Sequence, residues 1–482
     1  MLTSRVPRKS AIAGKWWALA TVIAASALAL LVSPRTPSLG PETTGDAELA
    51  RAVRQAADGG AYRGLAVALI DKGAVRLAGV GVTGGPDSAP VTASTPFEIG
   101  SVTKAMTGML LADLKLPADT KVRELLPDAG FGQAEIGDVT LAELASHRAG
   151  LPRVPLTPKL LALSYLSNLT GVDPYAGDGP DDVLAEAAGS SLSERGKVSY
   201  SNIGMAVLGL ALAKSQNMPY EELLRTRILR PLGMSSTAAL PSDAPLPANR
   251  AHGSKANGMA MDPWRGDGYL PAGVGVWSTA RDLATLVDAV RKGTAPGATA
   301  SEPRFTDTAK QRIGYGWFTT VFGRSTVTWH NGGTGGFRSF VGFDRATGRA
   351  AVVLGNTDAD VEPVALRLLG ADSSDREDSP PFLMLAITLV LTFSPGLEAW
   401  WGHRPYELTA GVAKALWGVF SLVLAWVAGV WSIIPPAVWA LGAGLLLASV
   451  LRWRGVPFAP RGARSWVRIA VPALLGLAVL LA

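Results

Sequence analysis

A serine and a lysine three residues apart, Ser101 and Lys104, have the types and the spacing needed for nucleophilic catalysis. If Ser101 opens a helix, positions i and i+3 share one helix face, so the amine can take the proton of the hydroxyl. The serine oxygen would then attack a carbonyl carbon and form an acyl-enzyme. The same spacing also fits a helix N-cap followed by a solvated lysine, so further elements are needed.

Two later elements supply the partners that such chemistry needs. Tyr200-Ser-Asn202 opens an apolar helical stretch, and His330-Asn-Gly-Gly333 follows a strand-like stretch. In this order, Ser-x-x-Lys, Tyr-x-Asn and His-x-Gly resemble the active-site elements of the serine β-lactamase and penicillin-binding-protein family. The tyrosine form resembles its class C β-lactamase, D-alanyl-D-alanine carboxypeptidase and esterase branch. Residues 146–152 and 273–283 resemble supporting segments of the family, and the resemblance covers roughly residues 45–370.

The resemblance implies a role for each residue. Ser101 is the nucleophile, and Lys104 is the general base, for which burial near other cations should lower the pKa. Tyr200 shares the proton with Lys104 and passes it to the leaving group. Asn202 hydrogen-bonds the substrate amide or Lys104; the alternative is a simple helix cap.

The third element departs from the family pattern. His330 stands where lysine is usual, and a histidine is charged at pH 7 less often, which weakens the expectation of carboxylate recognition and of efficient β-lactam turnover. Asn331 replaces the usual Thr or Ser. Gly332 and Gly333 let the backbone approach the substrate closely, and the N–H groups of Ser101 and Gly333 are the expected oxyanion hole. The alternative is that the glycines only form a hairpin turn.

Strand-like and helical patterns predict the elements that position these residues. Strands from both ends of the domain and a helical subdomain between them predict an α/β (α+β), β-lactamase-like fold, with a mixed or antiparallel sheet flanked by helices. The strands are expected at residues 65–70, 74–80, 315–322, 325–330, 337–344 and 350–355, and the helices at residues 105–114, 141–146, 181–188, 203–214 and 220–229.

Apolar segments at both ends predict a membrane protein. A basic start and an apolar run at residues 16–32 indicate a signal peptide or, as we favour, an uncleaved signal anchor. The expected organisation is a signal segment (1–33), a linker (34–46), the hydrolase domain (47–370), a linker (371–381) and a C-terminal transmembrane region of about four helices (382–482).

Basic residues give the orientation of these spans. The apolar stretches lie at residues 382–393, 415–434, 437–451 and 467–482, and the loop between the last two carries Arg452, Arg454, Arg461 and Arg464 without an acid. The positive-inside rule places this loop and the N-terminus in the cytoplasm. With five spans, the N-terminus and the arginine loop both lie in the cytoplasm, as their charges predict, and the catalytic domain lies outside. If residues 382–393 form an interfacial helix instead, the agreement is lost.

Composition excludes several kinds of site and partner. The 482 residues carry a net charge of +6 and no cysteine, which excludes disulfides and thiolate-ligated metals. The four histidines lack ligand spacing, and no basic stripe favours nucleic acid, so we expect no metal, no cofactor and no nucleic acid. The expected partners are the membrane and a small-molecule or peptide substrate.

The resulting prediction is an exported, membrane-anchored serine hydrolase acting on amide or ester bonds. Its substrates would be D-amino-acid peptides, esters or β-lactams. The alternatives are a true β-lactamase, a catalytically silent sensor that signals through the membrane helices, and a transporter-like membrane protein whose hydrolase-like domain has no function of its own.

Overall fold

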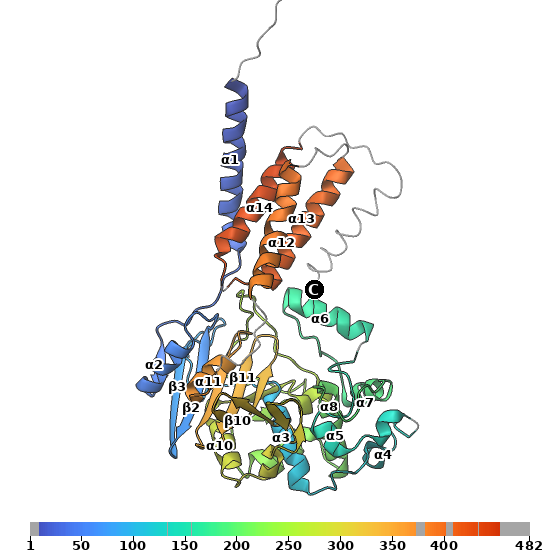
Figure 1. Ribbon diagram of the computed structural model, residues 1–482. Coiled ribbons are helices and arrows are strands. Elements are labelled where there is room, and N and C mark those ends of the chain that lie inside the picture. Colours follow the sequence, from blue (N-terminus) through green and yellow to red (C-terminus); the bar gives the residue numbers. More distant parts are fainter. Residues whose placement is uncertain are drawn as a thin grey trace, which may run out of the picture.

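An antiparallel sheet that joins both ends of the domain is the frame of the fold (Figure 1). The computed structural model describes residues 9–132, 134–155, 157–372, 381–401, 408–431 and 433–453. Within them the strand order is β1-β3-β2-β12-β11-β10-β9-β8-β7. The strands are β1 (Thr43–Gly45), β2 (Gly64–Asp71), β3 (Ala74–Gly81), β7 (Phe305–Thr306), β8 (Gln311–Ile313), β9 (Phe318–Phe322), β10 (Ser325–Gly333), β11 (Arg338–Asp344) and β12 (Ala350–Gly355).

Alternating side chains of the central strands build two apolar layers, one on each face of this sheet. On β2, Leu65, Val67 and Leu69 pack with α2 (Ala47–Ala56) and α11 (Glu362–Leu369). Ala66, Ala68 and Ile70 face the opposite layer, which includes α3 (Val102–Leu114) and α10 (Ala280–Arg291). Both layers are buried, so the central strands are apolar on both sides.

The helical subdomain lies beside the α3 face of the sheet (Figure 1). A small sheet of order β4-β6-β5 connects it to α3. Its strands are β4 (Phe97–Glu98), β5 (Ala238–Ala239) and β6 (Val276–Ser278), and the helices are α4 (Val122–Leu125), α5 (Leu141–Ala145), α6 (Pro158–Thr170), α7 (Pro180–Ala188), α8 (Asn202–Ser215) and α9 (Tyr220–Leu224).

The predicted arrangement is confirmed, with local corrections. Strands β2 and β12 are neighbours although the chain leaves the sheet between them, as expected for a sheet built from both ends. All pairings between these strands are antiparallel, so the sheet is not mixed. Strand β1 already joins the sheet within the expected linker 34–46. The helix predicted at residues 220–229 ends at Leu224 and continues as a π-turn.

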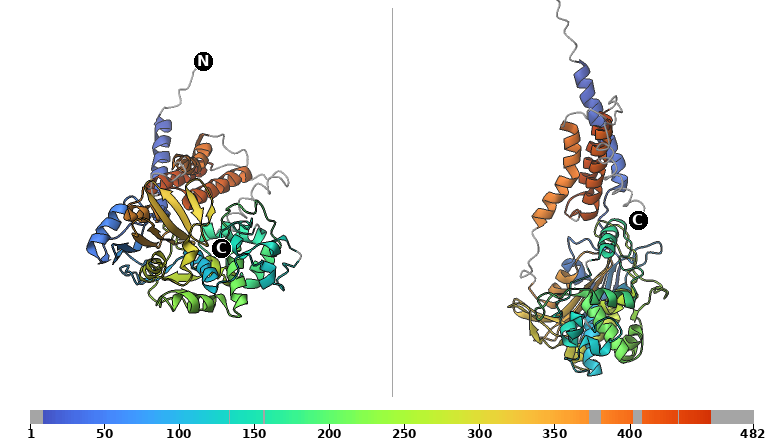
Figure 2. Two further views of the ribbon diagram at one scale, coloured as in Figure 1. Left: turned by 60° about the horizontal axis from the view of Figure 1, so that its bottom comes forward. Right: turned by 90° about the vertical axis from the view of Figure 1, so that its right-hand side faces the viewer.

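Apolar helices form a bundle on one side of the domain (Figure 2). They are α1 (Lys9–Ala29), α12 (Pro381–Trp401), α13 (Leu408–Ala428) and α14 (Pro436–Leu451). Phe382–Trp400 and Gly411–Ala428 are long and apolar enough to cross a membrane. Helix α12 thus continues well beyond the apolar stretch predicted at residues 382–393. The stretch predicted at residues 467–482, and most of the arginine loop, lie outside the described residues.

Small residues bring the helices of the bundle close together. A Cβ on Gly444 would lie 2.1 Å from Ser26 Oγ of α1, and one on Gly442 would lie 2.5 Å from the Thr392 carbonyl of α12. Close backbone approach through glycine is typical of helices that associate without water between them. Helix α14 therefore packs between α1 and α12.

Candidate active site

Ser101 lies at the start of α3, directly after the turn that follows β4. Gly100 makes this turn with a φ of +50°, and a Cβ there would lie 2.8 Å from the Gly333 nitrogen. The position therefore needs glycine both for its left-handed backbone and for the close approach of β10. The Ser101 hydroxyl makes no capping bond. It instead lies 2.7 Å from Lys104 Nζ.

Lys104 is buried beneath the serine, with 1% of its surface exposed. Its Nζ also donates to the Ala272 carbonyl oxygen at 2.6 Å. Burial, and then the positive charge of Arg153, lower the pKa of Lys104 well below the usual value of a lysine. A lysine with a lowered pKa can be a neutral base near physiological pH. The alternative of a solvated surface lysine is therefore wrong.

Tyr200 approaches Ser101 from the residue before the N-cap of α8. Its hydroxyl hydrogen-bonds Ser101, and Lys104 Nζ lies 5.1 Å from the centre of its ring. Its low-dielectric surroundings raise the pKa of Tyr200 to about 12, although the hydrogen bond with Ser101 opposes the rise. The phenol is therefore neutral and can donate a proton.

Asn202 is the first residue of α8 rather than its cap. The cap is Ser201, whose Oγ accepts from the Gly204 nitrogen at 2.9 Å. The Asn202 backbone nitrogen donates to the Arg153 carbonyl oxygen at 2.8 Å, and its side chain hydrogen-bonds the Tyr175 hydroxyl. Asn202 lines the cleft beside Ser101, so the helix-cap interpretation is wrong.

His330 is fully buried on β10 behind Tyr200, at 6.2 Å between ring centres. Its Nδ1 lies 2.5 Å from the Asn331 carbonyl oxygen, which can only accept, so Nδ1 carries the ring proton. Burial, and then the charge of Lys104, lower the pKa of His330 to about 3. The ring is therefore neutral and provides no cation where the family pattern usually has lysine.

The end of β10 runs directly past the nucleophile. A Cβ on Gly332 would lie 2.1 Å from the Ile99 carbonyl oxygen and 3.0 Å from the Ser101 nitrogen. Only glycine allows this approach, which brings the backbone of Gly332 and Gly333 beside Ser101. The neighbouring Asn331 also lines the cleft, and its Nδ2 donates to Glu362 at 3.0 Å.

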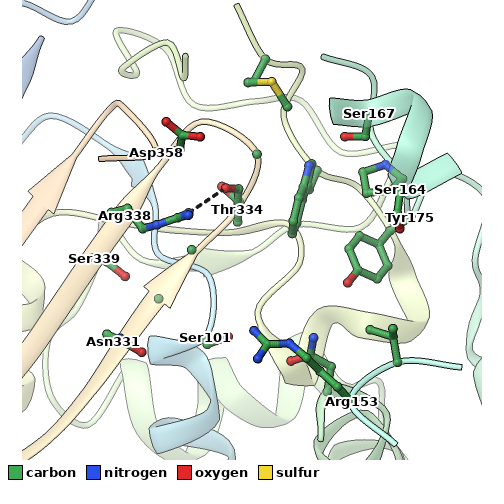
Figure 3. A pocket seen from close by; sticks show the side chains of 18 of the residues that line it. Ser101, Arg153, Ser164, Ser167, Tyr175, Asn331, Thr334, Arg338, Ser339 and Asp358 are labelled. Atoms are coloured by element: carbon green, nitrogen blue, oxygen red, sulfur yellow. Dashed lines mark hydrogen bonds between the residues drawn. The ribbon is translucent and has the colours of Figure 1, made fainter. Parts of the chain in front are cut away.

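These residues line one cleft of about 880 Å³ between the sheet and the helical subdomain (Figure 3). Ser101, Tyr200, Asn202, Gly332 and Gly333 all contribute to its wall, whereas Lys104 and His330 lie behind it. The sequence elements of the predicted site are thus brought together around a single hydroxyl. This is the geometry that a serine nucleophile with an adjacent base requires.

The family assignment agrees with this geometry, because residues 49–373 match the family described as Beta-lactamase. The chain belongs to the β-lactamase family. A class C β-lactamase from Rhodobacter sphaeroides has the same fold, with a TM-score of 0.55 and 24% identity, covering 66% of this chain and 97% of that one. The predicted family and fold are therefore confirmed.

Curated relatives are more distant and match only in part. A β-lactamase of Lysobacter lactamgenus is 28% identical over 252 residues, which are 50% of this chain and 59% of that protein. Penicillin-binding protein 4 of Amycolatopsis lactamdurans is 27% identical over 187 residues, which are 38% of this chain and 46% of that protein. The chain thus spans about half the length of these β-lactamase-family relatives.

Two arginines that line the cleft, Arg153 and Arg338, were not predicted from the sequence as site residues. Figure 3 shows Arg153 and Arg338 approaching from opposite sides, with Ser101 between them. Arg338 donates to the carbonyl oxygens of Thr334 at 3.2 Å and Phe337 at 3.1 Å. Arg153 lies 5.1 Å from the Tyr200 ring centre. Among the residues that the structure describes, no carboxylate forms an ion pair with either arginine.

Arg338 reaches the cleft because of the β10–β11 register. It pairs with Gly333, and its Nη1 lies 2.5 Å from the place where a Cβ of Gly333 would be. Its guanidinium therefore occupies the space that a side chain at 333 would fill. A sequence pattern carries no signal for this cross-strand contact, since it depends on the register of the hairpin.

A buried carboxyl, that of Glu98, hydrogen-bonds the backbone of a residue that lines the cleft. Glu98 on β4 is 2% exposed and accepts from the Trp264 nitrogen at 2.8 Å. Burial raises the pKa of Glu98 to about 8, against the opposing hydrogen bond from the Trp264 nitrogen. Throughout the part of the chain described, no three His, Cys, Asp or Glu residues are arranged to hold a metal ion.

Proposed function

We propose that this protein is a membrane-anchored serine hydrolase that works through an acyl-enzyme. The observation that carries the proposal is the 2.7 Å contact between Ser101 Oγ and the buried Lys104 Nζ. In its neutral form the amine takes the serine proton while Oγ attacks a carbonyl carbon. The N–H groups of Ser101 and Gly333 would stabilise the oxyanion.

The proton then leaves through Tyr200. As the tetrahedral intermediate collapses, the phenol donates its proton to the leaving nitrogen or oxygen and regains one from Lys104. Water then attacks the acyl-enzyme, its proton passes to the Lys104 and Tyr200 pair, and the free acid leaves with Ser101 restored. A neutral phenol next to the Ser101 and Lys104 pair suits this step, and the raised pKa of Tyr200 keeps it neutral.

The substrate is an amide or ester of D-amino-acid peptide, simple ester or β-lactam type. Because His330 is neutral, we assign recognition of an anionic group on the substrate to Arg338 and Arg153. Guanidinium groups without a carboxylate partner suit a substrate carboxylate. Accordingly the preferred acyl donor carries a negative charge close to the scissile bond.

A true β-lactamase is the second candidate. The likeness to β-lactamases of Rhodobacter sphaeroides and Lysobacter lactamgenus favours it. The His-x-Gly form of the third element, which resembles that of the peptidase and esterase relatives, favours those activities instead. A catalytically silent sensor would not need a buried lysine against the serine, so the Lys104 contact argues against that alternative.

Membrane anchoring is the second half of the proposal. The apolar lengths of α12 and α13, and the apolar α1 packed on α14, support it. The positive-inside pattern of the sequence favours an extracytoplasmic catalytic domain. Reaction of a membrane-impermeant reagent with an engineered surface cysteine in the catalytic domain of intact cells tests this orientation.

The test of the chemistry compares three substrates in the full-length protein: an aryl ester, a chromogenic cephalosporin and a D-alanyl-D-alanine peptide. We expect at least one to be hydrolysed, and Ser101→Ala and Lys104→Met each to lower kcat by about a thousandfold or more. Lys115→Met, on the exposed end of the same helix, is the matched control and should remain active. Equal activity of wild type and Ser101→Ala would overturn the proposal.

A further inference from the structure

One rim of the cleft is formed by α6 and the loop of residues 254–261. Ser164, Ser167 and Asn168 of α6 line the cleft, as do Lys255 and Met261 of the loop. Lys255 Nζ donates to Asn168 Oδ1 at 2.7 Å, which ties the loop to the helix. The Asp262 nitrogen also donates to the carbonyl oxygen of residue 171, just beyond the end of α6. The two segments therefore act as one wall of the cleft.

The same loop contacts the apolar helix bundle. Asn257 Nδ2 donates to the carbonyl oxygens of Trp426 at 3.0 Å and Val427 at 3.3 Å, near the end of α13. The Asn257 carbonyl oxygen accepts from the Arg35 nitrogen at 2.9 Å, just after the end of the α1 segment. The side chain of Asn257 is buried in this contact. The wall of the cleft is thus joined directly to the domain-facing end of the bundle.

The position of α6 follows from this junction. Figures 1 and 2 show α6 on the side of the domain that faces the bundle, close to the level at which the apolar helices begin. Its sequence, PKLLALSYLSNLT, is largely apolar. Leu163 and Leu166 are only half-buried and Ala162 is exposed, although Ser164, Ser167 and Asn168 line the cleft. Partly exposed apolar residues that lie next to the ends of membrane spans can be buried in the membrane interface.

We propose that α6 lies in the membrane interface and that the cleft opens at the bilayer surface. The substrate is then an acyl donor held in the membrane by a lipid chain, with its reactive end reaching Ser101 along the bilayer surface. The inference rests on the proposed hydrolase and on its membrane anchoring, and it adds the physical form of the substrate.

The chemistry of the cleft is consistent with such a substrate. Arg153, Lys255 and Arg338 line the cleft together with Asp358 and Asp360, which leaves a small excess of positive charge for an anionic head group. The apolar residues of α6 would remain in contact with acyl chains while the reactive carbonyl reaches the nucleophile. The reaction is the one proposed above. The acyl group is transferred to Ser101 and then to water, and the alcohol or amine leaves with a proton.

The test uses full-length protein in nanodiscs and one depsipeptide in two forms, N-acetyl- and N-palmitoyl-D-alanyl-D-lactate. Release of D-lactate gives kcat/KM for each form. We expect the palmitoyl form to be preferred by about tenfold or more. Leu163→Glu with Leu166→Glu should reduce the ratio of the two kcat/KM values, palmitoyl over acetyl, by about tenfold, because the charges lift α6 from the interface. Ala162→Glu, at an exposed position that does not need repacking, should act in the same direction.

The control is Val321→Glu on β9, where the side chain is 41% exposed and away from α6. It should leave the preference intact. Acetyl turnover without a preference for the palmitoyl form, or a preference that the α6 charges do not change, would overturn this inference alone. No turnover of either form, in a protein that hydrolyses one of the three substrates above, would also overturn this inference; no turnover of any of them would overturn the proposed hydrolase as well.

Discussion

Replacing Gly333 by alanine should weaken the preference for an anionic substrate that we propose for this protein. The new Cβ would lie 2.5 Å from Arg338 Nη1, which is too close for any real contact. Because the obstacle is the flexible end of a long side chain, the guanidinium can move away and the fold should survive. The cleft then loses one of the two cations, Arg338, that we assign to the substrate carboxylate.

The size of the effect follows from the bond that is lost. A hydrogen bond between charged groups contributes about 1.5–3 kcal/mol, which corresponds to about 10- to 150-fold in kcat/KM. The loss should affect an N-acyl-D-alanyl-D-lactate with a free carboxylate, and not its methyl ester. Arg338→Gln should show the same selective loss, and the double variant should lose little more, since both changes remove one interaction.

Gly332→Ala is the contrasting variant. There the Cβ would meet the Ile99 carbonyl oxygen at 2.1 Å, which belongs to the backbone behind Ser101. The nucleophile must shift, so both the free acid and the methyl ester should lose turnover. If Gly333→Ala reduces the two substrates equally while Arg338→Gln has no effect, the assignment of the anion to Arg338 is refuted.

Two further predictions concern pH. Because the charge of Arg153 lowers the pKa of Lys104, Arg153→Gln should raise that pKa and move the acid limb of kcat/KM to higher pH; an unmoved limb measured with an uncharged ester contradicts this. Glu98 has a folded-state pKa of about 8, above its unfolded value, so its carboxyl stays protonated in the fold while the unfolded chain ionises. Its contribution is fully present below about pH 4.5 and is lost as the pH rises through about 8. Thermal unfolding should therefore show stability falling across this window in the wild type and a flatter profile in Glu98→Gln, whereas parallel profiles would contradict the burial argument.

The sequence could bring together the proposed nucleophile and its proposed base because their geometry is local. Ser101 and Lys104 are one helical turn apart, so any helix that starts at Ser101 brings them together. Tyr200 and His330 are distant in the chain, and only the resemblance to the family brought them to the same site. Helix boundaries that depend on apolar periodicity, such as those of α3 and α8, were also close to the observed ones.

The remaining features depend on tertiary contacts that no local pattern encodes. The neutrality of His330 results from complete burial, and the place of Arg338 in the cleft results from its pairing with Gly333. The sequence also gave no sign that β1 pairs with β3, because its three residues lack an apolar alternation. The same holds for the contact of Asn257 with α13, which joins segments about 170 residues apart.

The most direct test of the central claim is the intact mass of the full-length protein after brief exposure to an activated ester, a penicillin and a D-alanyl-D-lactate depsipeptide. We expect an acyl adduct with at least one of them, localised to Ser101 by peptide mapping and absent from Ser101→Ala. Ser94→Ala, at a neighbouring exposed serine, should still form it. A folded protein that forms no adduct, or the same adduct in Ser101→Ala, would contradict the account.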